Sequence, residues 1–109
     1  MSLKGESAVK EMIFDVVLGT PIGKRNGVVY LYVKDNNIVG KLEIFGGEFE
    51  LYGMMFDDKN CELYGMFKTL FNEFYYKAVG QIADDKLNLV MKGSSKKYKL
   101  EGVRRNSGE

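Results

Sequence analysis

The stretch IVGKLEIFGGEFELYGMMFDDKNCELYGMF, residues 38–67, is the most informative about the fold. Apolar and polar residues alternate along it, and the alternation is interrupted at Gly46-Gly47 and at Asp58-Lys59-Asn60. A period of two is typical of strands that bury one face, and the two interruptions are typical of tight turns. The stretch therefore predicts three consecutive antiparallel strands and no helix.

The same alternation continues on both sides, with turn residues recurring every ten to thirteen positions. Pro21 is the only proline and falls in the longest expected connection, residues 19–27, where its missing N–H costs no ladder hydrogen bond. We predict an all-β, eight-stranded antiparallel up-and-down meander barrel, because closure removes unpaired strand edges; a strongly coiled open sheet is the alternative. The expected strands are 12–18, 28–34, 38–45, 48–57, 61–70, 74–82, 86–92 and 97–104.

Loop length predicts which residues face each other across a hairpin. Two-residue turns at Gly46-Gly47, Asn72-Glu73 and Asp84-Asp85, and a three-residue turn ending in a left-handed Asn60, put the apolar residues on one inner face. Glycine is unfavourable inside strands, so a row of glycines indicates strong curvature of the sheet or, alternatively, the floor of a ligand cavity. These registers predict such a row from Gly40, Gly53, Gly65 and Gly80.

Length and composition indicate one soluble globular domain over residues 1–109, with residues 1–10 and 105–109 as flexible ends. Apolar residues make up 45% of the chain and charged residues 28%, and the net charge of +1 argues against a dedicated binder of polyanions. The chain has a single cysteine, no signal-peptide pattern and no apolar run long enough to span a bilayer as a helix. A cytoplasmic location without a membrane partner is expected.

The meander with glycine-bearing strands resembles the small streptavidin-like and lipocalin-like (calycin) barrels, over nearly the whole chain. The lipocalin Gly-x-Trp signature is absent, since the chain has no tryptophan, and the resemblance implies no ligand residues. The string GTPIGKRNG at residues 19–27, with Thr69-Leu70 and the spacing of Tyr76, Ala78 and Gly80, is similar to a family of uncharacterised short bacterial proteins. That similarity implies no known activity.

The chain contains no histidine, which excludes Ser/His and Cys/His catalytic pairs and histidine metal sites. Cys61 opens an expected strand and is predicted to be a buried or half-buried side chain rather than a reactive thiol. The strand carboxylates alternate against the apolar set and are expected to point outward. We therefore expect no catalytic residues, no metal ligands and no cofactor, and a protein that is not an enzyme.

Strand parity predicts that the two ends of the barrel differ in charge. One end carries acidic turns, Asp35-Asn36-Asn37, Asp57-Asp58 and Asp84-Asp85, whose residues are explained by turn formation without calcium. The opposite end carries a flexible loop at residues 19–27 and is surrounded by basic side chains: Lys24, Arg25, Lys68, Lys92, Lys96 and Lys97.

The basic end has two interpretations. It is a mouth that attracts a small apolar or anionic ligand, or its lysines are ordinary solubilising residues at strand ends. The region lacks the Gly-Lys-Ser/Thr ending of a phosphate-binding loop, so nucleotide binding is not expected. The candidate ligand-binding residues, at the mouth and inside the barrel, are Lys24, Arg25, Thr69, Tyr76 and Tyr98.

The outer face of one hairpin is unusually apolar. The expected register pairs Met54 with Tyr64 and Tyr52 with Met66 across two strands. An exposed apolar patch of this kind usually marks a surface that is buried against a partner. The commonest such partner is a second copy of the chain, related by a two-fold axis. The candidate interface of a homodimer is Tyr52, Met54, Phe56, Tyr64 and Met66.

Four functions follow, in order of preference. The first is a non-catalytic barrel that binds a small molecule or a partner, and the second is a structural or interaction protein that acts as a homodimer through its outer Tyr/Met face. Binding of single-stranded nucleic acid, with basic and aromatic residues interleaved, is less favoured because the charge is near neutral. An enzyme using Tyr, Lys or carboxylate groups is also less favoured.

Overall fold

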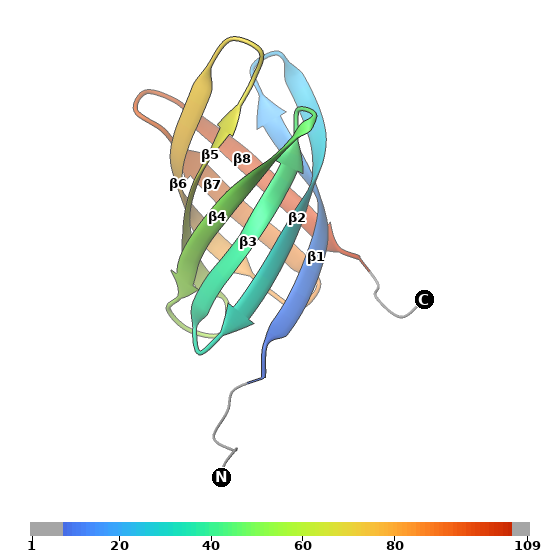
Figure 1. The fold of residues 1–109 in the computed structure, drawn as a ribbon, viewed down its shortest axis with the longest axis vertical. Coiled ribbons are helices and arrows are strands. Elements are labelled where there is room, and N and C mark those ends of the chain that lie inside the picture. Colours follow the sequence, from blue (N-terminus) through green and yellow to red (C-terminus); the bar gives the residue numbers. More distant parts are fainter. Residues whose placement is uncertain (1–7, 106–109) are drawn as a thin grey trace.

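The computed structural model describes residues 8–105 and is a closed barrel of eight antiparallel strands in meander order (Figure 1). The predicted fold class is confirmed. Pairing of β1 with β8, from Phe14 opposite Arg104 to Gly19 opposite Lys99, excludes the open-sheet alternative. The strands are β1 Lys10–Thr20, β2 Gly23–Lys34, β3 Asn37–Ile44, β4 Gly47–Met55, β5 Asn60–Lys68, β6 Glu73–Ile82, β7 Lys86–Lys92 and β8 Lys97–Arg104.

The two chain ends are only partly covered by this description. Of the segments expected to be flexible ends, residues 1–7 and 106–109 lie outside the described residues. Lys10 begins β1, and the amide of Arg105 donates a hydrogen bond of 2.7 Å to the carbonyl of Ile13. Within residues 8–105 there is no helix long and apolar enough to cross a membrane.

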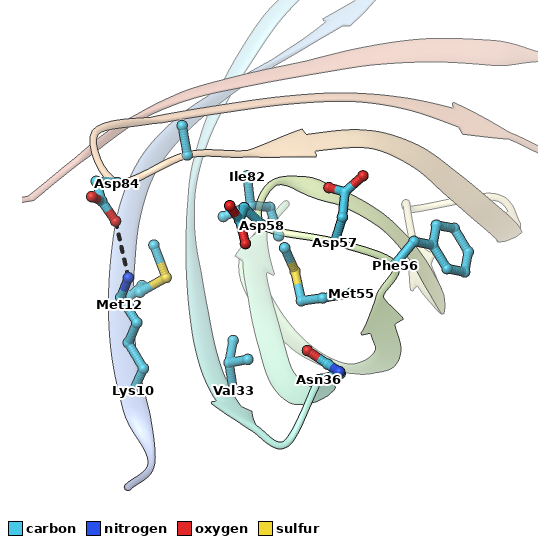
Figure 2. Close-up of a pocket in the computed structure, with 11 residues that line it drawn as sticks. Lys10, Met12, Val33, Asn36, Met55, Phe56, Asp57, Asp58, Ile82 and Asp84 are labelled. Atoms are coloured by element: carbon cyan, nitrogen blue, oxygen red, sulfur yellow. Dashed lines mark hydrogen bonds and ion pairs between the residues drawn. The ribbon is translucent and has the colours of Figure 1, made fainter. Parts of the chain in front are cut away.

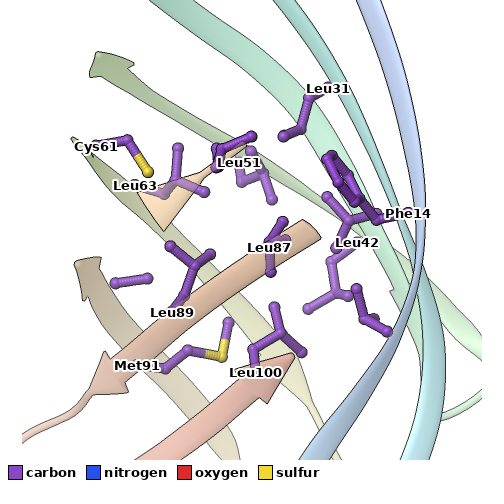
Figure 3. Packing of buried hydrophobic residues seen from close by; sticks show 14 of the residues in the cluster. Phe14, Leu31, Leu42, Leu51, Cys61, Leu63, Leu87, Leu89, Met91 and Leu100 are labelled. Atoms are coloured by element: carbon purple, nitrogen blue, oxygen red, sulfur yellow. The ribbon is translucent and has the colours of Figure 1, made fainter. Parts of the chain in front are cut away.

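Alternation along every strand directs the apolar side chains into the barrel, where they pack against one another (Figure 3). Phe14, Leu31, Leu42 and Leu87 are fully buried, and Cys61 is buried as predicted. Burial of each such side chain stabilises the fold by roughly 1.5–3 kcal/mol relative to exposure, so this interior is the main source of stability. Among the described residues, none of the charged or strongly polar types is buried.

Alternate turns lie at opposite ends of the barrel, as the sequence predicts. We call the end with turns at residues 21–22, 45–46, 69–72 and 93–96 the basic end, at the top of Figure 1. The end with turns at residues 35–36, 56–59 and 83–85 is the acidic end.

The predicted registers of three hairpins are wrong, although the predicted inner face is right. Gly40 lies opposite Leu51 rather than Gly53, and Gly65 lies opposite Tyr76 rather than Gly80. The β3–β4 and β4–β5 registers differ from prediction by two residues and the β5–β6 register by four. An even shift keeps each side chain on its face, so burial alone could not distinguish these alternatives.

The register errors come from the turns. The β3–β4 turn is made by Phe45 and Gly46, with φ of 55° and 75°, instead of Gly46-Gly47. Asn60 begins β5 instead of ending a turn, and the β5–β6 connection has four residues, 69–72. In the remaining predicted hairpin, Ile82 does face Leu87 across the turn at residues 83–85.

The long flexible loop predicted at residues 19–27 is also wrong. β1 and β2 continue as a paired hairpin up to Thr20 opposite Gly23, and only Pro21 and Ile22 form the turn. Proline fits this position because its fixed φ suits the first central residue of a tight turn.

The glycines do not form the predicted row, but three of them allow the sheet to curve. A Cβ added to Gly40 would lie 1.9 Å from the Tyr30 carbonyl oxygen, and one added to Gly53 would lie 2.0 Å from that of Glu62. At Gly80 the corresponding distance, to the Asn88 carbonyl, is 2.0 Å. Neighbouring backbones thus occupy the space of a side chain, which lets the sheet bend sharply enough to close.

Candidate functional site

Two adjoining hollows open at the basic end. The first, about 270 Å³, lies between the β1–β2 turn and the aromatic residues beneath it. The second, about 210 Å³, lies beside the β5–β6 and β7–β8 turns. They share four lining residues, so a ligand can extend from one to the other: Phe67, Thr69, Lys96 and Tyr98.

Aromatic rings form the floor of these hollows. The ring centroid of Phe67 lies 5.3 Å from that of Phe45 and 5.1 Å from that of Phe74. Tyr98 continues the contact, 4.9 Å from Phe74. Such separations are typical of tilted aromatic pairs, and the cluster closes the barrel interior below the mouth. A ligand at this end would therefore rest on the rings and not enter the barrel.

Most of the cations around the mouth form no ion pair within the described residues. Within residues 8–105, no ion pair involves Lys24, Arg25, Lys92, Lys96 or Lys97. Glu73 lines the second hollow and pairs with Lys68 of the basic set at 3.6 Å, and Glu48 pairs with Lys41 at 3.3 Å. The mouth thus combines an apolar floor with unpaired positive charge.

The structure places three of the five candidate ligand-binding residues together. Arg25, Thr69 and Tyr98 line the first hollow, with Lys96 added to them. Lys24 is exposed on the same hairpin but does not line either hollow. Lys96 could have been included from the sequence, since it belongs to the basic set expected at this end.

Tyr76 lies below the mouth, inside the barrel. Its ring centroid is 6.1 Å from that of Phe67, and its hydroxyl covers the space above Gly65, 2.5 Å from where a Cβ would stand. The hydroxyl has no hydrogen-bond partner within residues 8–105, and burial raises the pKa of the phenol. This group does not face either hollow.

Sequence reasoning missed the exposed apolar side chains at the tips of the basic end. Ile22 is 82% exposed, Leu70 89% and Phe71 86%. Leu70 was expected to end a strand, and no role was assigned to Phe71. The sequence did contain a signal for a turn with an apolar tip. Thr69 and Asn72, whose residue types favour turns, flank the two apolar residues Leu70 and Phe71.

A third hollow, which the sequence did not predict, opens at the acidic end (Figure 2). Its volume is about 430 Å³, with Met12, Met55 and Ile82 at its apolar base. Lys10 pairs with Asp84 at one side of it, with 2.9 Å between Nζ and Oδ1, and this hydrogen bond lowers the pKa of Asp84.

Asp57, also on this rim, organises the β4–β5 turn. Its carboxylate accepts hydrogen bonds from the amides of Lys59 and Asn60 at 2.9 and 2.8 Å, and from the Asn60 side chain at 2.7 Å. These bonds, those from Asn60 and Lys59 amides first, lower the pKa of Asp57 to about 2. No group of three or more His, Cys, Asp or Glu in residues 8–105 is arranged to hold a metal ion.

The outer apolar face exists, but with a different register. Tyr52 faces Tyr64, with stacked rings 5.6 Å apart, and Met54 faces Glu62; the predicted Met54–Tyr64 and Tyr52–Met66 pairs are wrong. Phe56 lies just beyond the end of β4. Tyr52, Met54 and Phe56 are exposed, whereas Tyr64 and Met66 are half-buried.

Two polar contacts limit this face on one side. The Tyr64 hydroxyl donates to Glu62 at 2.6 Å, and Lys77 pairs with the same carboxylate at 2.9 Å. The pKa of Glu62 is lowered by these two partners, the tyrosine hydrogen bond first. On the other side the face continues over β3 and β2, where Val39 lies opposite both Tyr52 and Tyr32.

The architecture is compatible with calycin-like barrels, as the meander suggested. No family model matches the chain, and no curated protein or solved structure shows a significant match to it.

Proposed function

We propose that the basic end of the barrel binds a small amphiphilic molecule that carries an anionic group. The observation that carries the proposal is the first hollow, which Arg25 and Lys96 line together with Phe45, Phe67 and Tyr98, and the two cations form no ion pair within residues 8–105. Ligand sites are typically apolar hollows with a few polar groups that set orientation. The apolar part would contact the rings, and the anionic group would contact the two cations.

The size of the hollow narrows the ligand class. At about 270 Å³ it is near the lower limit for small-molecule sites, so the ligand is short or only partly enclosed. Thr69 and Tyr98 supply hydroxyl groups at the boundary with the second hollow, which suits a further polar substituent. A medium-chain carboxylate has the required chemistry.

The proposal is for binding without catalysis. The chain has no histidine, and burial raises the pKa of the Cys61 thiol to about 11, which keeps it protonated at neutral pH. The likeness to streptavidin-like and lipocalin-like barrels is consistent with a binding role.

The test is isothermal titration calorimetry with decanoate and, separately, decanol. We expect saturable binding of decanoate that weakens roughly tenfold or more in the double variant Arg25→Gln/Lys96→Gln, since charge-assisted hydrogen bonds contribute about 1.5–3 kcal/mol each. Lys86→Gln, at the opposite end, is the matched control and should bind as the wild type does. Absence of decanoate binding, or equal binding of decanol, contradicts the proposal.

A second candidate function is a homodimer through the outer face. It is favoured by the straight row Tyr32, Val39, Tyr52 and Tyr64, in which each residue lies directly opposite the next across β2 to β5. Tyr52 is 62% exposed and Val39 57%, which is unusual for neighbouring apolar residues on the wall of a barrel.

Native mass spectrometry with light scattering tests this second candidate. We expect a dimer that dissociates in the double variant Val39→Glu/Tyr52→Glu. Val103→Glu, equally exposed on β8, serves as the control and should remain dimeric. A wild-type protein that is monomeric at every micromolar concentration tried contradicts the candidate.

A further inference from the structure

Two hairpin turns at the basic end are built alike and present apolar side chains at their tips. The sequences are Thr20-Pro21-Ile22-Gly23 and residues 69–72, Thr-Leu-Phe-Asn. In the first, the Thr20 hydroxyl donates to the Gly23 carbonyl. In the second, the Thr69 amide donates to the Asn72 carbonyl at 2.8 Å, and the Asn72 amide donates to the Thr69 hydroxyl at 3.2 Å.

These closing hydrogen bonds leave the two central residues of each turn directed away from the barrel. Ile22, Leu70 and Phe71 are all more than four-fifths exposed, and they are the most exposed large apolar residues of the described chain. Figure 1 shows both turns projecting from the same end. An exposed group of this size usually contacts an apolar partner in function.

Positive charge surrounds the apolar tips. The cations of the basic end that form no ion pair within residues 8–105 lie in these turns or beside them in the strands: Lys24, Arg25, Lys92, Lys96 and Lys97. At the opposite end the turn carboxylates are accompanied by cations, Lys10, Lys59 and Lys86 among them, whereas at the basic end cations outnumber carboxylates. An anionic surface would therefore attract the basic end more strongly than the acidic end.

We propose that the basic end docks on an anionic lipid bilayer, with Ile22, Leu70 and Phe71 inserted among the headgroups and the cations against the lipid charge. A protein partner needs a continuous complementary surface of about 800 Å² per side. Two separate tips, each with one or two apolar side chains, do not offer such a surface, whereas a fluid bilayer accommodates them independently. This docking does not depend on binding of a small molecule.

The experiment is co-sedimentation of the whole chain with vesicles. One preparation contains equal parts of phosphatidylcholine and phosphatidylserine, and the other contains phosphatidylcholine alone. We expect binding to the first, weaker binding to the second, and loss of binding to the first as salt is raised, because exposed charges are screened. No binding to the anionic vesicles overturns the proposal, as does equal binding to both.

Two variants distinguish insertion of the apolar turn tips into the bilayer from a general effect of exposed apolar side chains. Leu70→Ser/Phe71→Ser should weaken binding at least about tenfold, because burial of one large apolar side chain corresponds to more than one factor of ten. Val103→Ser, which removes an exposed apolar group from the barrel wall, is the control and should bind like the wild type. Equal loss in both, or no loss in the tip variant, overturns the proposal.

A third variant tests the charge. Lys24→Glu/Lys97→Glu should also lose vesicle binding, while Lys86→Glu at the acidic end should not. Decanoate binding in vesicle-free solution should be unchanged in Leu70→Ser/Phe71→Ser, because neither residue lines the hollows. Failure of docking is thereby distinguishable from failure of the small-molecule site.

Discussion

The basic and acidic ends of this barrel are closed by the same kind of hairpin, yet their polar groups are used differently. At the acidic end Asp57 holds its own turn together, and Asp84 pairs with Lys10. At the basic end Arg25 and Lys96 have no carboxylate partner in the described chain. Charge that is already satisfied within the fold contributes little to recognition, so the basic end is the better candidate for contact with other molecules.

The two halves of the barrel also fill their interior differently. Towards the basic end, the rings of Phe45, Phe67 and Phe74 occupy the space between the strands. Towards the acidic end, Gly40 and Gly53 let neighbouring backbones approach instead. The ring cluster can therefore be tested by removing side-chain volume, and the close backbone approach at Gly53 by adding it.

The largest expected effect is at the ring cluster. Phe67→Ala should lower the free energy of unfolding by about 3–5 kcal/mol, because it leaves a cavity among three aromatic neighbours. Met55→Ala, a half-buried residue at the acidic hollow, should cost only about 1–2 kcal/mol. Denaturant titration measures both, and equal losses would mean that the ring cluster has no special role.

A glycine substitution should damage the acidic half by overpacking. Gly53→Ala should cost on the order of 3 kcal/mol, since its Cβ would overlap the Glu62 carbonyl oxygen and the Cα of Leu63. Gly19→Ala, near the basic end, meets nothing closer than 3.9 Å and should change stability by less than about 0.5 kcal/mol. A tolerated Gly53→Ala, seen by thermal unfolding, would contradict the close backbone approach.

The hydroxyl of Tyr76 provides a smaller test, just below the mouth. Because it is buried without a partner, Tyr76→Phe should raise the free energy of unfolding by about 1 kcal/mol. Tyr98→Phe, at a half-buried position in the mouth, should leave stability nearly unchanged. A less stable Tyr76→Phe protein would show that the hydroxyl does have a partner, and would extend the polar site of the basic end into the barrel.

The smallest effect concerns the turn that Asp57 organises. Its pKa in the folded protein, about 2, is lower than the usual 3.8, so the ionised carboxylate stabilises the fold. This contribution is complete above about pH 3.8 and is lost as the pH falls towards 2. Asp57→Asn should therefore be less stable than the wild type at pH 7 and should converge with it in acid.

Thermal unfolding as a function of pH checks this last prediction. Asp58→Asn is the control, because no hydrogen bond to its side chain is present among the described residues and its substitution should leave the pH dependence unchanged. A constant difference between Asp57→Asn and the wild type across the acid range would contradict the role of the charged form.

The sequence by itself determined the eight-stranded antiparallel meander, the inward apolar face and the end of the barrel at which each turn lies. Each of these follows from local pattern: alternation sets which side chains are buried, and strand parity sets the end at which each turn lies. Arg25, Thr69 and Tyr98 were found in this way, because their place at the basic end follows from parity alone.

Only the tertiary structure decided the registers, the turn residues and the shape of the mouth. A shift of two residues keeps every side chain on its face, so Phe45-Gly46 and Gly46-Gly47 turns bury the same set and pattern cannot separate them. The choice depends on how neighbouring backbones pack at Gly40, Gly53 and Gly80, which is a property of the closed barrel. The buried Tyr76 hydroxyl, which has no hydrogen-bond partner among the described residues, is likewise a result of packing that no local pattern encodes.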